Sequence, residues 1–215
     1  MSVTIGRWTR LAALGAGLAT AAAIALASAG SALADPVDGT GTATITFNTH
    51  FLANLAKWGI IVIPENPASS SDTSGYDAFT LPVTGGNGSD TNYSGDVDLA
   101  GALTFIDAAT GHTVQFTSLE LDYYDGVITG VPAGTTQTIW IADVAGNLWT
   151  NNGTGSETFG ASQLAIDPQG ASYLNTTLRS TSVGKHNGKT YSAFTAGTDT
   201  AGKHAFVITY AVTIT

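Results

Sequence analysis

Histidine is the side chain of this chain best suited to hold a metal ion, because cysteine is absent from the sequence. Zinc sites draw their ligands from short, regular spacings, such as two histidines separated by three residues. No His-x-x-x-His or His-Glu-x-x-His motif occurs, and each histidine stands alone. The four are His50, His112, His186 and His204. The sequence therefore predicts no metal site.

Carboxylates form the second set with chemical potential, since two carboxyl groups can cleave a glycosidic bond. The candidates are Asp96, Asp98, Glu120, Asp122 and Asp125. The first four alternate with apolar residues, and this alternation places them on the solvent face of strands. No Gly-x-Ser-x-Gly motif supplies a serine nucleophile instead. We expect no enzymatic activity.

Aromatic residues gather near the ends of predicted strands, where β-proteins often bind ligands. The alternative is that they are core or rim residues, as tyrosine and tryptophan usually are. His112 has the alternative of a solvated loop residue, and His50 that of a capping or packing residue in a helix. The predicted ligand-binding set is His50, Tyr93, His112, Tyr123 and Trp140.

Strands must position these side chains, because alternation with a period of two dominates the chain after residue 40. Residues 42–47, 96–105 and 206–214 each keep one apolar phase, and turns rich in Gly, Asn and Asp separate the runs. The phase changes near Thr117 and Ser118, which predicts a bulge or a corner between sheets. We predict an all-β fold, a single-domain antiparallel β-sandwich or barrel-like sheet.

One short N-terminal helix is expected near residues 48–58, since Phe51, Leu52, Leu55 and Trp58 recur at helical spacing and Gly59 follows. Residues 66–76 are polar and are predicted to be a surface loop. In the segment 151–203, strands are expected around 163–166 and 191–195, with long loops between them.

Residues 1–34 have the pattern of a secretory signal peptide: Arg7 and Arg10, then an apolar stretch, then Ala32-Leu33-Ala34 before Asp35. The mature domain would be residues 35–215, secreted or held at the cell envelope, with no membrane insertion after removal of the signal. Loss of the two arginines leaves five basic residues against sixteen acidic ones, a net charge of −11. Such a charge disfavours binding to nucleic acid.

The order of elements resembles the HtaA-type domain, a β-rich secreted family associated with haem uptake. The similarity covers about residues 41–145. It rests on Phe51-Leu52-Ala53-Asn54-Leu55, on the segment 79–86 followed by 94–99, and on the paired strands 102–105 and 114–121. In that family a helical tyrosine binds the haem iron and a histidine supports it. The matching positions here are Asn54 and 99–101, so the haem ligands of the family are absent.

The sequence thus leads to two functional hypotheses. The first is an exported, non-catalytic module that binds a small hydrophobic or haem-like ligand at the cell envelope, haem being the candidate cofactor. The alternative is a structural or adhesive envelope protein without a small-molecule ligand. A pocket lined by Tyr123, Trp140 and a histidine would favour the first, and a fully packed interior would favour the second. The oligomeric state is not predicted.

Overall fold

A computed structural model describes the chain at residues 35–36, 41–47, 49–73, 76–89, 94–153, 156–178, 182–186, 189–195 and 210–214. The predicted signal peptide and Tyr93 lie outside these residues. All described elements belong to one compact unit, residues 34–215. Among the described residues, no helix is long and apolar enough to cross a membrane.

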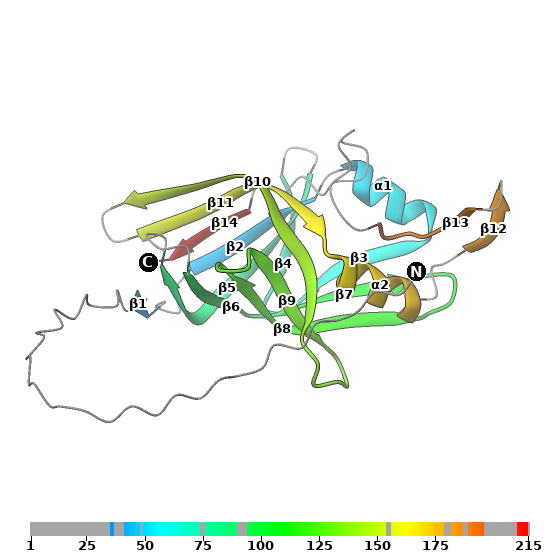
Figure 1. The fold of residues 1–215 in the computed structure, drawn as a ribbon, viewed down its shortest axis with the longest axis horizontal. Coiled ribbons are helices and arrows are strands. Elements are labelled where there is room, and N and C mark those ends of the chain that lie inside the picture. The colour runs from blue at the N-terminus through cyan, green and yellow to red at the C-terminus, as the bar shows by residue number, and fades with distance from the viewer. Residues whose placement is uncertain are drawn as a thin grey trace, which may run out of the picture. The chain divides into compact units, whose positions relative to one another are not determined.

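The described elements are mostly strands (Figure 1). The strands are β1 (Asp35–Pro36), β2 (Gly41–Thr46), β3 (Ile60–Glu65), β4 (Ser69–Thr73), β5 (Tyr76–Ser89), β6 (Ser94–Leu99), β7 (Ala102–Asp107), β8 (Thr113–Asp122), β9 (Val127–Pro132), β10 (Ile139–Gly153), β11 (Ser156–Ile166), β12 (Ser182–His186), β13 (Lys189–Tyr191) and β14 (Tyr210–Ile214). The two helices are α1 (Thr49–Lys57) and α2 (Pro168–Thr177).

Twelve of these strands form one sheet in the order β1-β5-β2-β14-β11-β10-β9-β8-β7-β3, with β4 and β6 attached beside this path. The sheet curls into a half-barrel (Figure 1), and β6 bridges its flanks by pairing with both β5 and β8. The pairings are antiparallel, including the separate β12–β13 hairpin. The predicted all-β antiparallel fold is confirmed in its barrel-like form.

Strand β8 changes partners at the predicted corner. Its first half pairs with β7, where Phe116 lies opposite Leu103, and its second half pairs with β6, where Leu121 lies opposite Val97. The register with β9 shifts between Thr117 and Glu120, and Ser118 has a φ of 47°. An extra residue at this point restores the apolar phase on the core side, so the predicted bulge is confirmed.

The core occupies the concave side of the sheet, as the alternation requires. Its fully enclosed residues include Ala43, Leu81, Val97, Phe116 and Leu121, each 0% exposed. Helix α1 closes part of this core with Phe51 and Leu55, confirming the predicted N-terminal helix. Gly59 follows it with a φ of 72°, a conformation that glycine adopts without steric cost.

Three sequence predictions need correction. Helix α2 was not expected; Asp167 caps it by accepting a hydrogen bond from the Gln169 N–H at 2.6 Å, and Pro168 starts it. Strand β4 lies in the predicted surface loop, where pairing with β5 holds a polar segment extended. The strand expected at 191–195 ends at Tyr191, because Phe194 instead inserts into the core from an irregular segment.

Candidate functional site

Four of the residues predicted to bind a ligand are described, and they occupy separate parts of the fold. His50 is the second residue of α1, and His112 is a half-buried residue of the turn between β7 and β8. Tyr123 directly follows β8, is 8% exposed and packs in the core, as the alternative for the aromatic residues proposed. Trp140 in β10 is 43% exposed, and its backbone N–H donates to Gln169 Oε1 at 2.7 Å. Among the described side chains, those of His112, Tyr123 and Trp140 do not line the cavities described below.

Distance along β8 separates two of these residues. His112 and Tyr123 flank opposite ends of a ten-residue strand. At the usual rise per residue, about 30 Å of strand lies between them. One small ligand therefore cannot contact both side chains.

The concave interior holds a small cavity of about 40 Å³. Its lining is entirely apolar and comes from β2, β7, β9, β10 and β11; the residues are Ile45, Phe47, Leu103, Phe105, Ile128, Ile141, Ala142, Leu164 and Ile166. Dry apolar cavities of such size occur in ordinary protein cores. A haem or another large ligand does not fit there without repacking.

Asn54, the helix position that the sequence resemblance compares with a haem-ligating tyrosine, is also closely packed. Asn54 Nδ2 donates to the Ala193 carbonyl at 3.4 Å, and the cavity beside it measures about 10 Å³. Phe194 follows in the core, with its ring centroid 5.7 Å from that of Phe105. Asn175 of α2 fixes this segment, because its Oδ1 accepts from the Phe194 N–H at 3.1 Å and its Nδ2 donates to the Phe194 carbonyl at 2.8 Å.

A larger hollow of about 330 Å³ lies where β9 ends beside β8 and where α2 approaches. We call it the Tyr173 groove; its lining residues are Thr104, Thr113, Val114, Gln115, Pro132, Ala133, Tyr173 and Thr177. The Ala133 N–H donates to the Gln115 carbonyl at 2.8 Å and fixes the departure of the chain from β9. This volume is within the range of small-molecule sites.

The lining of the Tyr173 groove is neutral. Four of its described residues carry hydroxyl groups and one carries an amide, and none is charged. Thr104 is 7% exposed, and its buried Oγ1 has no hydrogen-bond partner among the described residues. Tyr173 is half-buried, with its ring centroid 6.0 Å from that of Phe116. The groove thus combines an aromatic ring with neutral donors and acceptors.

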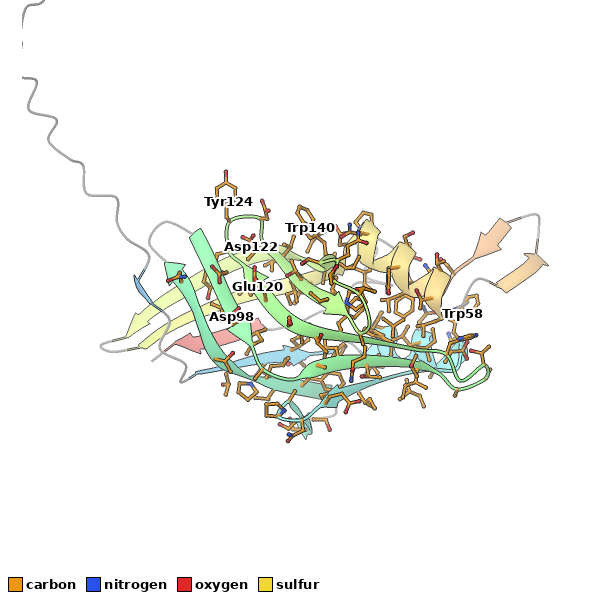
Figure 2. All side chains as sticks on the ribbon, turned by 90° about the horizontal axis from the view of Figure 1, so that it is seen from below. Trp58, Asp98, Glu120, Asp122, Tyr124 and Trp140 are labelled. Carbon is orange, nitrogen blue, oxygen red and sulfur yellow. The ribbon has the colours of Figure 1, made fainter. Side chains whose placement is uncertain are left out.

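The acidic residues do come together, on the face of the sheet opposite the core. Oxygens of Asp96, Asp98 and Glu120 lie within 4.8 Å of one another, and Asp122 pairs across the strands with Asp96. Figure 2 shows Asp98, Glu120 and Asp122 on neighbouring strands, with Tyr124 projecting from the turn beyond β8. Their predicted location on the solvent face is confirmed by the burial of Val97, Leu99, Leu119 and Leu121 between them.

The carboxylates of this acidic cluster repel one another. Desolvation, together with Asp98 and Asp122, raises the pKa of Asp96 above its usual value. The pKa of Glu120 is also raised, first by desolvation and then by the negative charges of Asp96, Asp98 and Asp122. Carboxylate oxygens are ligands that Ca²⁺ accepts, but exposed acidic groups commonly occur without an ion. The cluster alone does not identify a metal site.

None of the residues that line the Tyr173 groove belongs to the set predicted from the sequence to bind a ligand. Thr113 and Gln115 occupy the polar phase of β8, where hydroxyl and amide side chains are typical of a solvated strand face. Tyr173 and Thr177 belong to α2, which was not predicted. A signal was present, because Asp167 precedes Pro168, and Ala171, Leu174 and Leu178 recur at helical spacing.

Comparison of the chain with known proteins found no match. No family model matches the chain, and neither a curated protein nor a solved structure matches it. The resemblance to the HtaA-type domain therefore rests on the sequence motifs quoted above.

Proposed function

We propose that this chain is an exported, non-catalytic binding module that holds a small uncharged ligand with a hydrophobic face in the Tyr173 groove. The observation that carries the proposal is the groove itself: about 330 Å³, lined by uncharged polar residues and an aromatic residue. A concave pocket with few, placed polar groups is the usual form of a small-molecule site. Export is taken from the signal pattern in residues 1–34.

The groove supports this proposal better than the interior does. A cavity of about 40 Å³ admits only a few atoms, and its lining offers no polar group to orient a ligand. The cavity at Asn54 is smaller still. A haem-like ligand would need a site other than these two, so haem serves as the competing probe in the test.

The test uses the protein from Asp35 onward. Binding of benzyl alcohol, cyclohexanol and Nile red is measured by ligand-observed NMR, and binding of haem is measured by absorbance. Ala133→Trp places a large ring in the groove, and Ala108→Trp is the matched control at an exposed alanine outside it. We expect saturable binding of at least one uncharged probe, abolished by Ala133→Trp and retained by Ala108→Trp. Binding that ignores both substitutions would refute the groove as the site. Tight haem binding alone would favour the haem-like alternative.

A structural or adhesive role is the second candidate function, and one observation favours it. Strand β3 ends the order of the sheet, and its Ile61 and Ile63 are 51% and 36% exposed. Exposed apolar side chains on an edge strand favour association between sheets. Failure of every probe to bind, combined with self-association that Ile61→Lys abolishes, would support this role instead.

A further inference from the structure

We infer that the ligand of the Tyr173 groove is a neutral saccharide, bound as a single pyranose ring or as the end of a glycan. This inference rests on the proposed function, because it names the ligand class of the same site. Three properties of the groove lead to it: its polar groups, its charge and its aromatic ring.

The polar groups of the groove match hydroxyls. Each threonine hydroxyl both donates and accepts, and the Gln115 amide offers two donors and an acceptor. A sugar hydroxyl also donates and accepts, so it can pair with either kind of group. The Oγ1 of Thr104 is buried out of reach of water, so the polar groups that a ligand in the groove can pair with are those of the other lining residues.

The charge of the groove argues against the charged ligand classes. No lysine or arginine is among its described lining residues, and the whole chain carries a net charge of −9. An anionic ligand would be repelled by this surface and would find no cationic partner in the groove. A cationic ligand would find no carboxylate among the same lining residues.

The aromatic ring explains why a sugar fits better than a plain polyol. Tyrosine presents an apolar ring and a polar tip, and a pyranose presents an apolar C–H face and a hydroxylated rim. The contact between Tyr173 and Phe116, with ring planes at 52°, holds the tyrosine against the core. A preorganised ring loses less conformational entropy when a ligand binds. The volume of about 330 Å³ is at the small end for ligand sites, which favours one ring over an extended chain.

The test measures binding of methyl β-glucoside, methyl α-mannoside, methyl β-galactoside and N-acetylglucosamine by titration calorimetry and ligand-observed NMR. Glucose 6-phosphate carries the same ring with charge, and cyclohexanol carries a ring with a single hydroxyl. We expect at least one neutral sugar to bind saturably, and both comparison ligands to bind at least about tenfold more weakly, the loss typical of one good hydrogen bond.

Substitutions locate the binding. Gln115→Ala and Tyr173→Ala should each weaken sugar binding by about tenfold or more, the value of one lost contact, whereas Tyr173→Phe should weaken it less. Tyr124→Ala is the control, at a tyrosine that is 81% exposed and outside the groove. Thr104→Val is a second control: its hydroxyl is buried away from the groove, so sugar binding should be retained. If Tyr173→Ala fails to fold, Gln115→Ala keeps the test decisive, because it removes a half-buried side chain of the groove and should weaken binding with little change in the melting temperature.

The outcomes distinguish the two proposals. Binding of cyclohexanol or Nile red that Ala133→Trp abolishes, without binding of any sugar, would overturn the saccharide and leave the proposed function standing. Sugar binding that Ala133→Trp does not affect would overturn the inference by placing the site elsewhere. Absence of binding by every probe would overturn both.

Discussion

The two halves of β8 use the same alternating pattern to build different surfaces. In the first half, the polar phase carries Thr113 and Gln115, and the Tyr173 groove lies beside it. In the second half, the polar phase carries Glu120 and Asp122, and β6 adds Asp96 and Asp98 opposite them. One surface is neutral and hollowed, whereas the other is acidic and repulsive.

The difference arises from the partners of the strand. At the corner around Ser118, β8 exchanges β7 for β6, and each partner brings its own cross-strand residues. Opposite Gln115 stands the uncharged Thr104, whereas opposite Glu120 stands Asp98. Cross-strand neighbours determine the energetics of a sheet face more than the residues of a single strand do.

The largest expected effect is on the core beneath the groove. Phe116→Ala should lower the free energy of unfolding by about 3–5 kcal/mol, because it leaves a cavity at a 0% exposed position. It should also release Tyr173 and weaken binding in the groove. Leu121→Ala, equally buried under the acidic half, should cost about 2–5 kcal/mol without affecting the groove. Urea denaturation and the probe titrations measure both. Equal losses of binding in the two variants would contradict the separation of the halves.

The second largest effect on stability is expected from substitutions at the corner between the two halves of β8. Ser118 has a φ of 47°, where a β-branched residue is strained. Ser118→Val should therefore destabilise the fold by about 1–3 kcal/mol. Ser118→Gly should stabilise it by up to about 1 kcal/mol, since glycine adopts this conformation without steric cost. Thermal melts of the two variants should move in opposite directions; a shift in the same direction would argue against strain at the corner.

The acidic half should give a smaller effect that depends on pH. A carboxyl whose pKa is raised on folding holds its proton more tightly in the folded state, so stability is lost as the pH rises from the ordinary carboxyl pKa through the raised value. Asp96 and Glu120 both have raised pKa values, because of desolvation and neighbouring carboxylates. Glu120→Gln should stabilise the protein at pH 7 by about 0.2–1 kcal/mol, the cost of like charges across strands. The gain should vanish below the carboxyl pKa.

Urea denaturation between about pH 3 and about pH 7 measures how the gain in stability from Glu120→Gln depends on pH. Carboxyl groups are about fully protonated at the lower of these pH values and about fully ionised at the higher. Desolvation and Asp167 also raise the pKa of Asp143, so this residue changes stability in the same direction. Because Asp143 is present in both the unsubstituted protein and Glu120→Gln, its effect cancels when their free energies of unfolding are compared. A gain from Glu120→Gln that is the same at both ends of the range would show that repulsion is not its cause.

The neutral half should give the smallest effect on stability. Gln115→Glu introduces a carboxylate opposite Thr104, where no acidic residue stands across the strand. The change in the free energy of unfolding should stay within about 0.5 kcal/mol, as for an ordinary surface substitution. It is the matched control for Glu120→Gln in the same pH series. A destabilisation as large as the gain from Glu120→Gln would mean that the acidic field extends across the corner.

The strands that could be predicted from the sequence are those in which the position of a residue alone sets the face of the sheet that its side chain occupies. Alternation located β6, β7 and β8, and the change of phase located the corner at Ser118. It also placed the carboxylates on the outer face, because side-chain direction in a strand follows from position alone. Helix α1 was predicted for the same local reason, with its apolar spacing and Gly59 at its end.

Contacts between distant segments defined everything else. Strand β4 is polar and became a strand only by pairing with β5. Phe194 reached the core because Asn175, 19 residues earlier, bonds its backbone. The Tyr173 groove joins β7, β8, the end of β9 and α2, and no spacing along the chain brings those residues together.

The sequence by itself therefore determined the class of fold, the neutral and acidic polar phases of β8, and the absence of cysteine. Only the tertiary structure decided that one polar phase lies beside a hollow and the other forms a cluster of carboxylates. The physical reason is that alternation sets which side of a sheet a residue faces, while strand pairing and the placement of α2 set what stands beside it.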